Sequence, residues 1–121
     1  MDDLIDLDIS CTHPAAKDNR EAACAGPGGA ATKRDEMKRR HHAKDGTPGY
    51  TLVPGTIETY GRLGKPFQAL LRDLADRAAS TGACDRSQFL NWAHTEISVR
   101  LVKANAKIFM HFVGALSQGV G

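Results

Sequence analysis

Apolar and polar side chains alternate between Leu4 and Cys11, and only an extended strand can bury one face of a pattern with a period of two. Asp6 and Asp8 therefore lie on the same face of this strand. The opposite, apolar face consists of Ile5, Leu7, Ile9 and Cys11. The strand is expected to end near His13-Pro14, because proline has no N–H to donate to a strand ladder. The chain is thus expected to present two carboxylates side by side on one surface.

The second half of the chain has a helical period instead. Lys65-Pro66 opens one helix, since proline fits the first helical turn, and an apolar stripe follows at intervals of three or four residues. Asp85 and Gln88 then form a capping box ahead of a second stripe, which predicts a helix from about 87 to 116. That helix is longer than most globular helices. It is interpreted either as a second cover for the sheet or as a surface that meets a larger protein.

The middle of the chain mixes turn and strand signals. The glycine-rich stretch 23–31 is predicted to be a flexible loop, and Thr32 to cap a helix running from 33 to about 42. A turn at 45–49 precedes short strands at 50–53 and 56–60, broken by Pro54-Gly55. These elements predict an α/β fold: a small mixed sheet of three or so strands, a basic helix, and two covering C-terminal helices, one of them long.

Length and cysteine content bound the organisation. At 121 residues the chain is expected to form a single domain over 1–121, and its first strand begins so early that the domain is interpreted as truncated at its N-terminus. Three cysteines without paired spacing, and no apolar signal segment, predict reduced thiols in an intracellular protein, nuclear if the source is eukaryotic. No apolar run approaches the roughly 20 residues that span a bilayer, so no membrane partner is expected.

Positive charge is concentrated in one segment. The formal net charge of +2 is too small to indicate a nucleic-acid partner by itself. The local cluster consists of Lys33, Arg34, Lys38, Arg39, Arg40, His41, His42 and Lys44. Such a run is either a solvated helix face or a surface that binds the phosphates of a nucleic acid.

Asp8 and Lys38 together suggest phosphodiester chemistry. Carboxylates can hold Mg²⁺ or Mn²⁺, and a lysine can stabilise the negative charge that gathers in the transition state. Asp6 lies about 6 to 7 Å from Asp8 along the strand, so the two could flank one ion but are not expected to share it tightly, and a further acidic partner is needed. Glu58 is predicted to lie in the sheet near Asp8, either as a supporting ligand or paired with an arginine. The alternative for Asp6 and Asp8 is the solvent face of an edge strand.

Three motifs carry a family resemblance. They are Asp-Ile-Ser-Cys-Thr-His-Pro at 8–14, Glu-Met-Lys at 36–38, and Ile-Glu-Thr-Tyr-Gly-Arg-Leu-Gly at 57–64. In this order they resemble the restriction-enzyme-like endonuclease of the PD-(D/E)XK superfamily, found at the C-terminal end of non-LTR retrotransposon reverse transcriptase polyproteins. The resemblance covers most of the chain. It implies a metal-dependent nick in DNA, with Asp8 as a metal-binding aspartate and Lys38 as the catalytic lysine.

The chain departs from this family pattern at two places. No Pro-Asp strand precedes Asp8, so the family's first metal carboxylate has no counterpart, and His41-His42 stands where Lys-Tyr is usual. The resemblance implies a retroelement-derived endonuclease domain that is inactive in isolation if the missing carboxylate is essential. Its implied partners are the remainder of a polyprotein and the DNA backbone. The backbone contacts are expected from Arg34, Arg39, Arg40, His13 and Arg62.

Two hypotheses from other classes remain open, so enzymatic activity is not settled by the sequence. One is a non-catalytic basic remnant that binds nucleic acid without sequence preference. The other is an interaction module that uses its long C-terminal helix against a partner.

Overall fold

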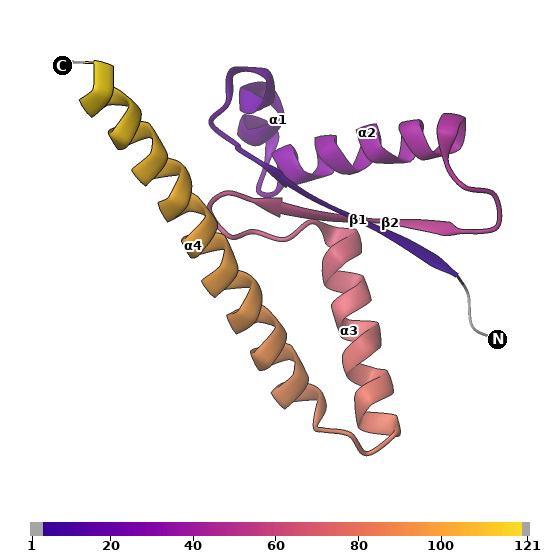
Figure 1. Ribbon diagram of the computed structural model, residues 1–121. Helices are drawn as coiled ribbons and strands as arrows, with labels where there is room; N and C mark the ends of the chain where they lie inside the picture. The colour runs from indigo at the N-terminus through magenta and orange to yellow at the C-terminus, as the bar shows by residue number, and fades with distance from the viewer. Residues whose placement is uncertain (1–3, 120–121) are drawn as a thin grey trace.

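The computed structural model describes residues 4–119 and is built on a parallel pair of strands (Figure 1). In the pair, Asp8 lies opposite Pro54 and Thr12 lies opposite Glu58. Parallel strands need a long crossover, and helices supply it here. In chain order the elements are β1 (Ile5–Thr12), η1 (Lys17–Asn19), α1 (Arg20–Ala25), α2 (Gly29–Asp45), β2 (Thr51–Glu58), α3 (Lys65–Ser80) and α4 (Arg86–Gly119).

The elements form three layers. Helix α2 covers one face of the sheet, α3 contacts β2 on the other face, and α4 packs against α3 (Figure 1). The α/β class is therefore confirmed, although the sheet within residues 4–119 has two parallel strands in place of three or so mixed ones. The two short strands expected at 50–53 and 56–60 form one continuous strand. Pro54 is tolerated there because β1 pairs along one side of β2, and the short antiparallel bridge on the other side, Ile57 with Leu63, does not reach Pro54.

The prediction of a flexible loop over 23–31 is wrong. Helix α1 ends at Ala25 and α2 begins at Gly29, so only a tight turn separates them. Gly28 is the residue before α2 and has φ 75°, a left-handed conformation that suits glycine. A Cβ at Gly29 would collide with the carbonyl of Ala22, so glycine lets the two helices meet closely. Thr32 consequently lies inside the helix rather than at its cap.

The apolar core lies between α3, α4 and β2. Its buried members are Leu63, Phe67, Leu71 and Ala93, and partly buried Ile57, Phe89, Leu90 and Ile97 pack against them. The apolar face of β1 lies outside this core, with Ile9 59% exposed. Helix α3 packs under β2, which leaves the underside of β1 open. The C-terminal helices thus cover only part of the sheet.

The layer between α2 and the sheet is rich in polar side chains, although α2 also buries Ala30 and Ala31. Thr56, Asp35 and Glu58 are buried in it, with 0%, 3% and 6% of their surface exposed. Among the described residues, every buried side-chain nitrogen or oxygen has a hydrogen-bond partner. Hydrogen bonds and ion pairs therefore hold this helix, which explains how a segment with almost no apolar side chains can be a packed helix. Within residues 4–119, no helix has the length and apolarity needed to cross a membrane.

Candidate active site on the polar face of the sheet

The polar face of β1 meets α2 at matched intervals. Lys38 Nζ lies 3.0 Å from Asp8 Oδ2, and Arg34 Nε donates to Ser10 Oγ over 3.4 Å. Two strand residues advance about 6.6 Å and four helical residues about 6 Å, so successive pairs stay aligned. The strand and the helix run in opposite directions past each other. This alignment brings together the acid and the amine that the sequence motifs singled out.

A cavity of about 310 Å³ opens beside this pair. Asp6, Asp8 and Lys38 line it, and the side chains of Asp8 and Lys38 are 36% and 21% exposed, so solvent can reach both. His41, His42 and Asp45 line the same cavity, although the motifs did not identify them as site residues. Their spacing from Lys38, three, four and seven residues, is the signal that places them on one helical face.

The donor set in this cavity fits a hard divalent cation held by few protein ligands. Mg²⁺ keeps several waters and commonly takes only one or two carboxylates together with substrate phosphates. Asp6, Asp8 and Asp45 are the carboxylates that line this cavity. Between residues 4 and 119, no group of three or more histidine, cysteine, aspartate or glutamate side chains is close enough to hold a metal alone.

Asp35 forms a second polar contact, deeper between α2 and the sheet. The Thr56 hydroxyl donates to Asp35 Oδ1 over 2.6 Å, and both residues are buried. Burial raises the pKa of Asp35 above its ordinary value, while the Thr56 hydrogen bond and the charge of Arg39 act in the opposite direction. This pair joins β2 to α2 one turn before Lys38, on the side of the helix that faces the sheet, and Asp35 does not line the cavity.

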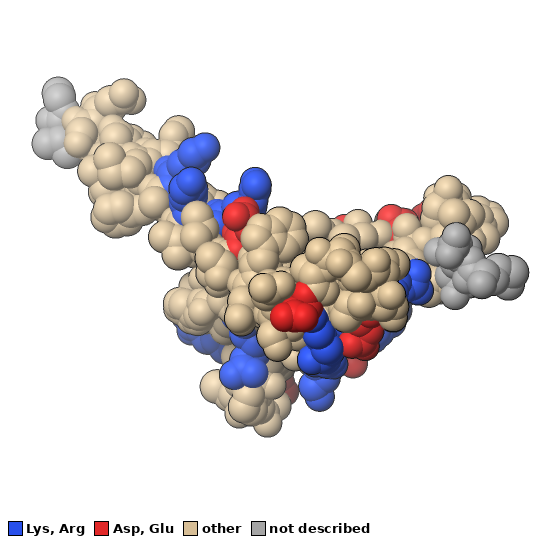
Figure 2. Space-filling view, turned by 90° about the horizontal axis from the view of Figure 1, so that it is seen from below, with Lys and Arg blue, Asp and Glu red and all other residues tan. Residues whose placement is uncertain are grey.

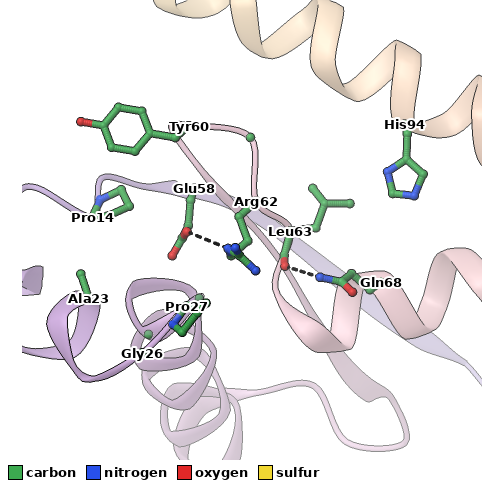
Figure 3. Close-up of a pocket in the computed structure, with 13 residues that line it drawn as sticks. Pro14, Ala23, Gly26, Pro27, Glu58, Tyr60, Arg62, Leu63, Gln68 and His94 are labelled. Carbon is green, nitrogen blue, oxygen red and sulfur yellow. Dashed lines mark hydrogen bonds and ion pairs between the residues drawn. The ribbon is translucent and has the colours of Figure 1, made fainter.

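Glu58 lies in the sheet and pairs with an arginine, as one alternative predicted, but it is not near Asp8, and that part of the prediction is wrong. It pairs in register with Thr12, four residues beyond Asp8, which is about 13 Å along the strand. Its Oε2 accepts the N–H of Ala31, one of the free donors in the first turn of α2, and its Oε1 lies 3.9 Å from Arg62 Nε. Figure 3 shows the Glu58–Arg62 pair in a separate cavity of about 690 Å³. The glutamate therefore caps a helix and is not placed to bind the same ion as Asp8.

The expected DNA-binding residues are spread over several surfaces. Arg34 lies beside the Asp8–Lys38 pair, but Arg39 and Arg40 follow Lys38 by one and two residues and are turned about 100° and 200° from it. His13 Nδ1 lies 2.6 Å from Thr59 Oγ1, at the far end of the sheet near Arg62. Of the five residues, Arg34 alone is placed beside the candidate site.

No protein-family model, curated protein or solved structure matches the chain. The resemblance to retroelement endonucleases therefore rests on the sequence motifs.

Proposed function

We propose that the chain is a metal-dependent DNA-nicking domain of retroelement origin, with its site at Asp8 and Lys38. The observation that carries the proposal is the 3.0 Å approach of a strand-borne carboxylate and a helix-borne amine at the wall of an open cavity. These two groups are the ones the motif resemblance names. Their convergence requires the fold, because Asp8 lies on β1 and Lys38 lies on α2, within the crossover that joins the two strands.

Each side chain has a distinct task in this proposal. Asp8, with Asp6 beside it, would hold Mg²⁺ or Mn²⁺, and the bound ion would polarise the phosphoryl group and lower the pKa of a water. Lys38 carries positive charge to the place where the phosphate gathers negative charge. Arg34 contacts Ser10, two residues beyond Asp8 on β1, and its guanidinium would bind the adjacent phosphate.

The direct test is nicking of supercoiled plasmid by the 121-residue chain with Mg²⁺ or Mn²⁺. Asp8→Asn is expected to remove metal-dependent nicking, and Lys38→Met to lower its rate by about 100-fold or more. Arg40→Gln is the matched control, since Arg40 lies on the helix side away from β1, and it is expected to nick normally. Nicking that survives Asp8→Asn would contradict the proposal.

The second candidate is a basic module that binds nucleic acid without cutting it. The placement of Arg34 and Lys38 on the face of α2 that borders β1 supports this candidate. It predicts no nicking by the unaltered chain, and DNA binding that weakens steeply with salt, depends on Arg34 and Lys38, and is insensitive to Asp8→Asn. A DNA-binding titration at two salt concentrations, run beside the plasmid assay, separates the two candidates.

A further inference from the structure

The C-terminal end of α4 projects away from the rest of the molecule (Figure 1). Its last contacts with the body are Leu101, 9% exposed, and Asn105, whose Nδ2 donates to Thr59 O over 3.2 Å. Every residue from 106 to 118 is exposed. We call residues 106–118 the α4 arm, and at 1.5 Å per residue it is about 20 Å long.

One side of the α4 arm is strongly apolar. The residues on it are Ile108, Phe109, Phe112, Val113 and Leu116, which are 70%, 63%, 59%, 38% and 55% exposed. Their spacing of one, four, five and eight residues places them within an arc of about 140°. An exposed apolar stripe of this size indicates a surface that another apolar surface covers.

The low charge of the α4 arm indicates which kind of partner surface can cover its apolar side. The arm contains one lysine, Lys107, and no arginine, aspartate or glutamate. Lys107 and His111 both lie outside the apolar arc. Figure 2 shows the projecting end largely free of charge, with basic side chains gathered nearer the body. Anionic lipid and nucleic acid are bound by clusters of several lysines and arginines, and a single lysine adds only about 1 kcal/mol at a membrane. The partner surface is therefore apolar and uncharged.

We propose that the α4 arm pairs with the α4 arm of a second copy of this chain, antiparallel, to form a homodimer. Ala106 and Ala115 flank the apolar arc on its two sides, and small flanking residues let two helices approach to about 8 to 10 Å. In an antiparallel overlap, Phe109 and Phe112 of one copy meet Val113 and Leu116 of the other. Lys107 then stays on the solvent side in both copies.

The area is sufficient for a weak, specific dimer. Two phenylalanines and three aliphatic side chains, mostly more than half exposed, offer on the order of 500 Å² per copy, or about 1,000 Å² in total. That is the lower limit for a specific interface, so we expect a dissociation constant on the order of micromolar.

Sedimentation velocity of the full chain over a concentration series tests the proposal. The unaltered chain is expected to reach twice the monomer mass of 13.0 kDa at about 100 µM. Phe109→Asp and the milder Phe109→Gln are both expected to raise the dissociation constant, by 10-fold or more for aspartate. Met110→Asp is the matched control, because Met110 is 66% exposed but is turned about 100° from Phe109, outside the arc. It is expected to dimerise normally.

Three outcomes would overturn the proposal. They are an unaltered chain that stays monomeric at about 100 µM, a dimer that Phe109→Asp leaves intact, and equal effects of Phe109→Asp and Met110→Asp. A monomer that floats with anionic phosphatidylserine vesicles would identify a lipid surface as the occupant instead. None of these measurements uses DNA or a metal, so failure here is separate from failure of the proposed nicking activity.

Discussion

The hydroxyl of Thr56 on β2 donates to the carboxylate of Asp35 on α2 over 2.6 Å, in a layer where neither residue has appreciable contact with solvent. Gly64, the residue before α3, closes this layer from the other side, because a Cβ at this position would lie 3.0 Å from Asp35 Oδ2. The acid is thus confined between the strand, the helix and the start of α3. It fixes the helix that carries Lys38.

Stability should reflect the titration of Asp35. Burial raises its pKa in the folded chain, so the folded state holds the proton more tightly than the unfolded state, whose pKa is about 3.9. The contribution of Asp35 to the free energy of unfolding is therefore fully present below about pH 3.9 and is lost as pH rises through the pKa of the folded state. Asp35→Asn mimics the protonated acid. Urea denaturation at several pH values gives the free energy of unfolding of both proteins. We expect the value for the unaltered chain minus the value for Asp35→Asn to fall as pH rises. A difference that rises with pH would contradict a raised pKa for Asp35.

Asp8 should matter more to chemistry than to stability. Its ion pair with Lys38 is partly exposed, and exposed pairs contribute at most about 1 kcal/mol. We expect Asp8→Asn to change the free energy of unfolding by less than about 1 kcal/mol, measured by urea denaturation at pH 7. A larger loss would mean that absence of nicking in this variant reports unfolding and not the loss of a metal ligand.

Glu58, in contrast to Asp8, should matter more to stability than to nicking. Its carboxylate accepts the buried N–H of Ala31, so Glu58→Ala leaves a helix-end donor without a partner and should lower stability by about 1 to 3 kcal/mol. Glu58→Gln retains an acceptor oxygen. Folded Glu58→Gln is expected to nick plasmid within about threefold of the unaltered rate, since the residue lies about 13 Å along the sheet from Asp8. Loss of nicking in a folded, stable Glu58→Gln protein would restore Glu58 to the site.

The exposed face of β1 gives a fourth prediction. Ile9 is 59% exposed whereas Leu71 is 7% exposed in the core. Leu71→Ala should lower the free energy of unfolding by about 2 to 5 kcal/mol, because it removes buried contacts and leaves a cavity. Ile9→Thr keeps the β-branched shape that suits a strand and should change it by less than about 0.5 kcal/mol. Comparable losses at both positions would show that the face of β1 is covered in solution.

Local sequence patterns determined β1, α3 and most of α4. Alternation over 5–11, proline in the first turn of α3, and the capping box at Asp85 each act within a few residues, and the structure keeps that box, with the N–H of Asp85 donating to Gln88 Oε1. Such signals do not depend on the rest of the fold. The same local reading failed at 23–31, where the glycines serve the close meeting of α1 and α2 instead of a flexible loop.

Only the tertiary structure decided which side chains share a site. The parallel register sets Glu58 opposite Thr12 and so separates Glu58 from Asp8. Because α2 and β1 run in opposite directions, Lys38 contacts Asp8 and Arg34 contacts Ser10. Register is fixed by pairing between segments some 46 residues apart, as the Ile5–Thr51 pair shows, and no pattern within either segment encodes it. The sequence alone therefore identified residue types that can bind a phosphate. Which of these side chains lie together depended on how the chain packs.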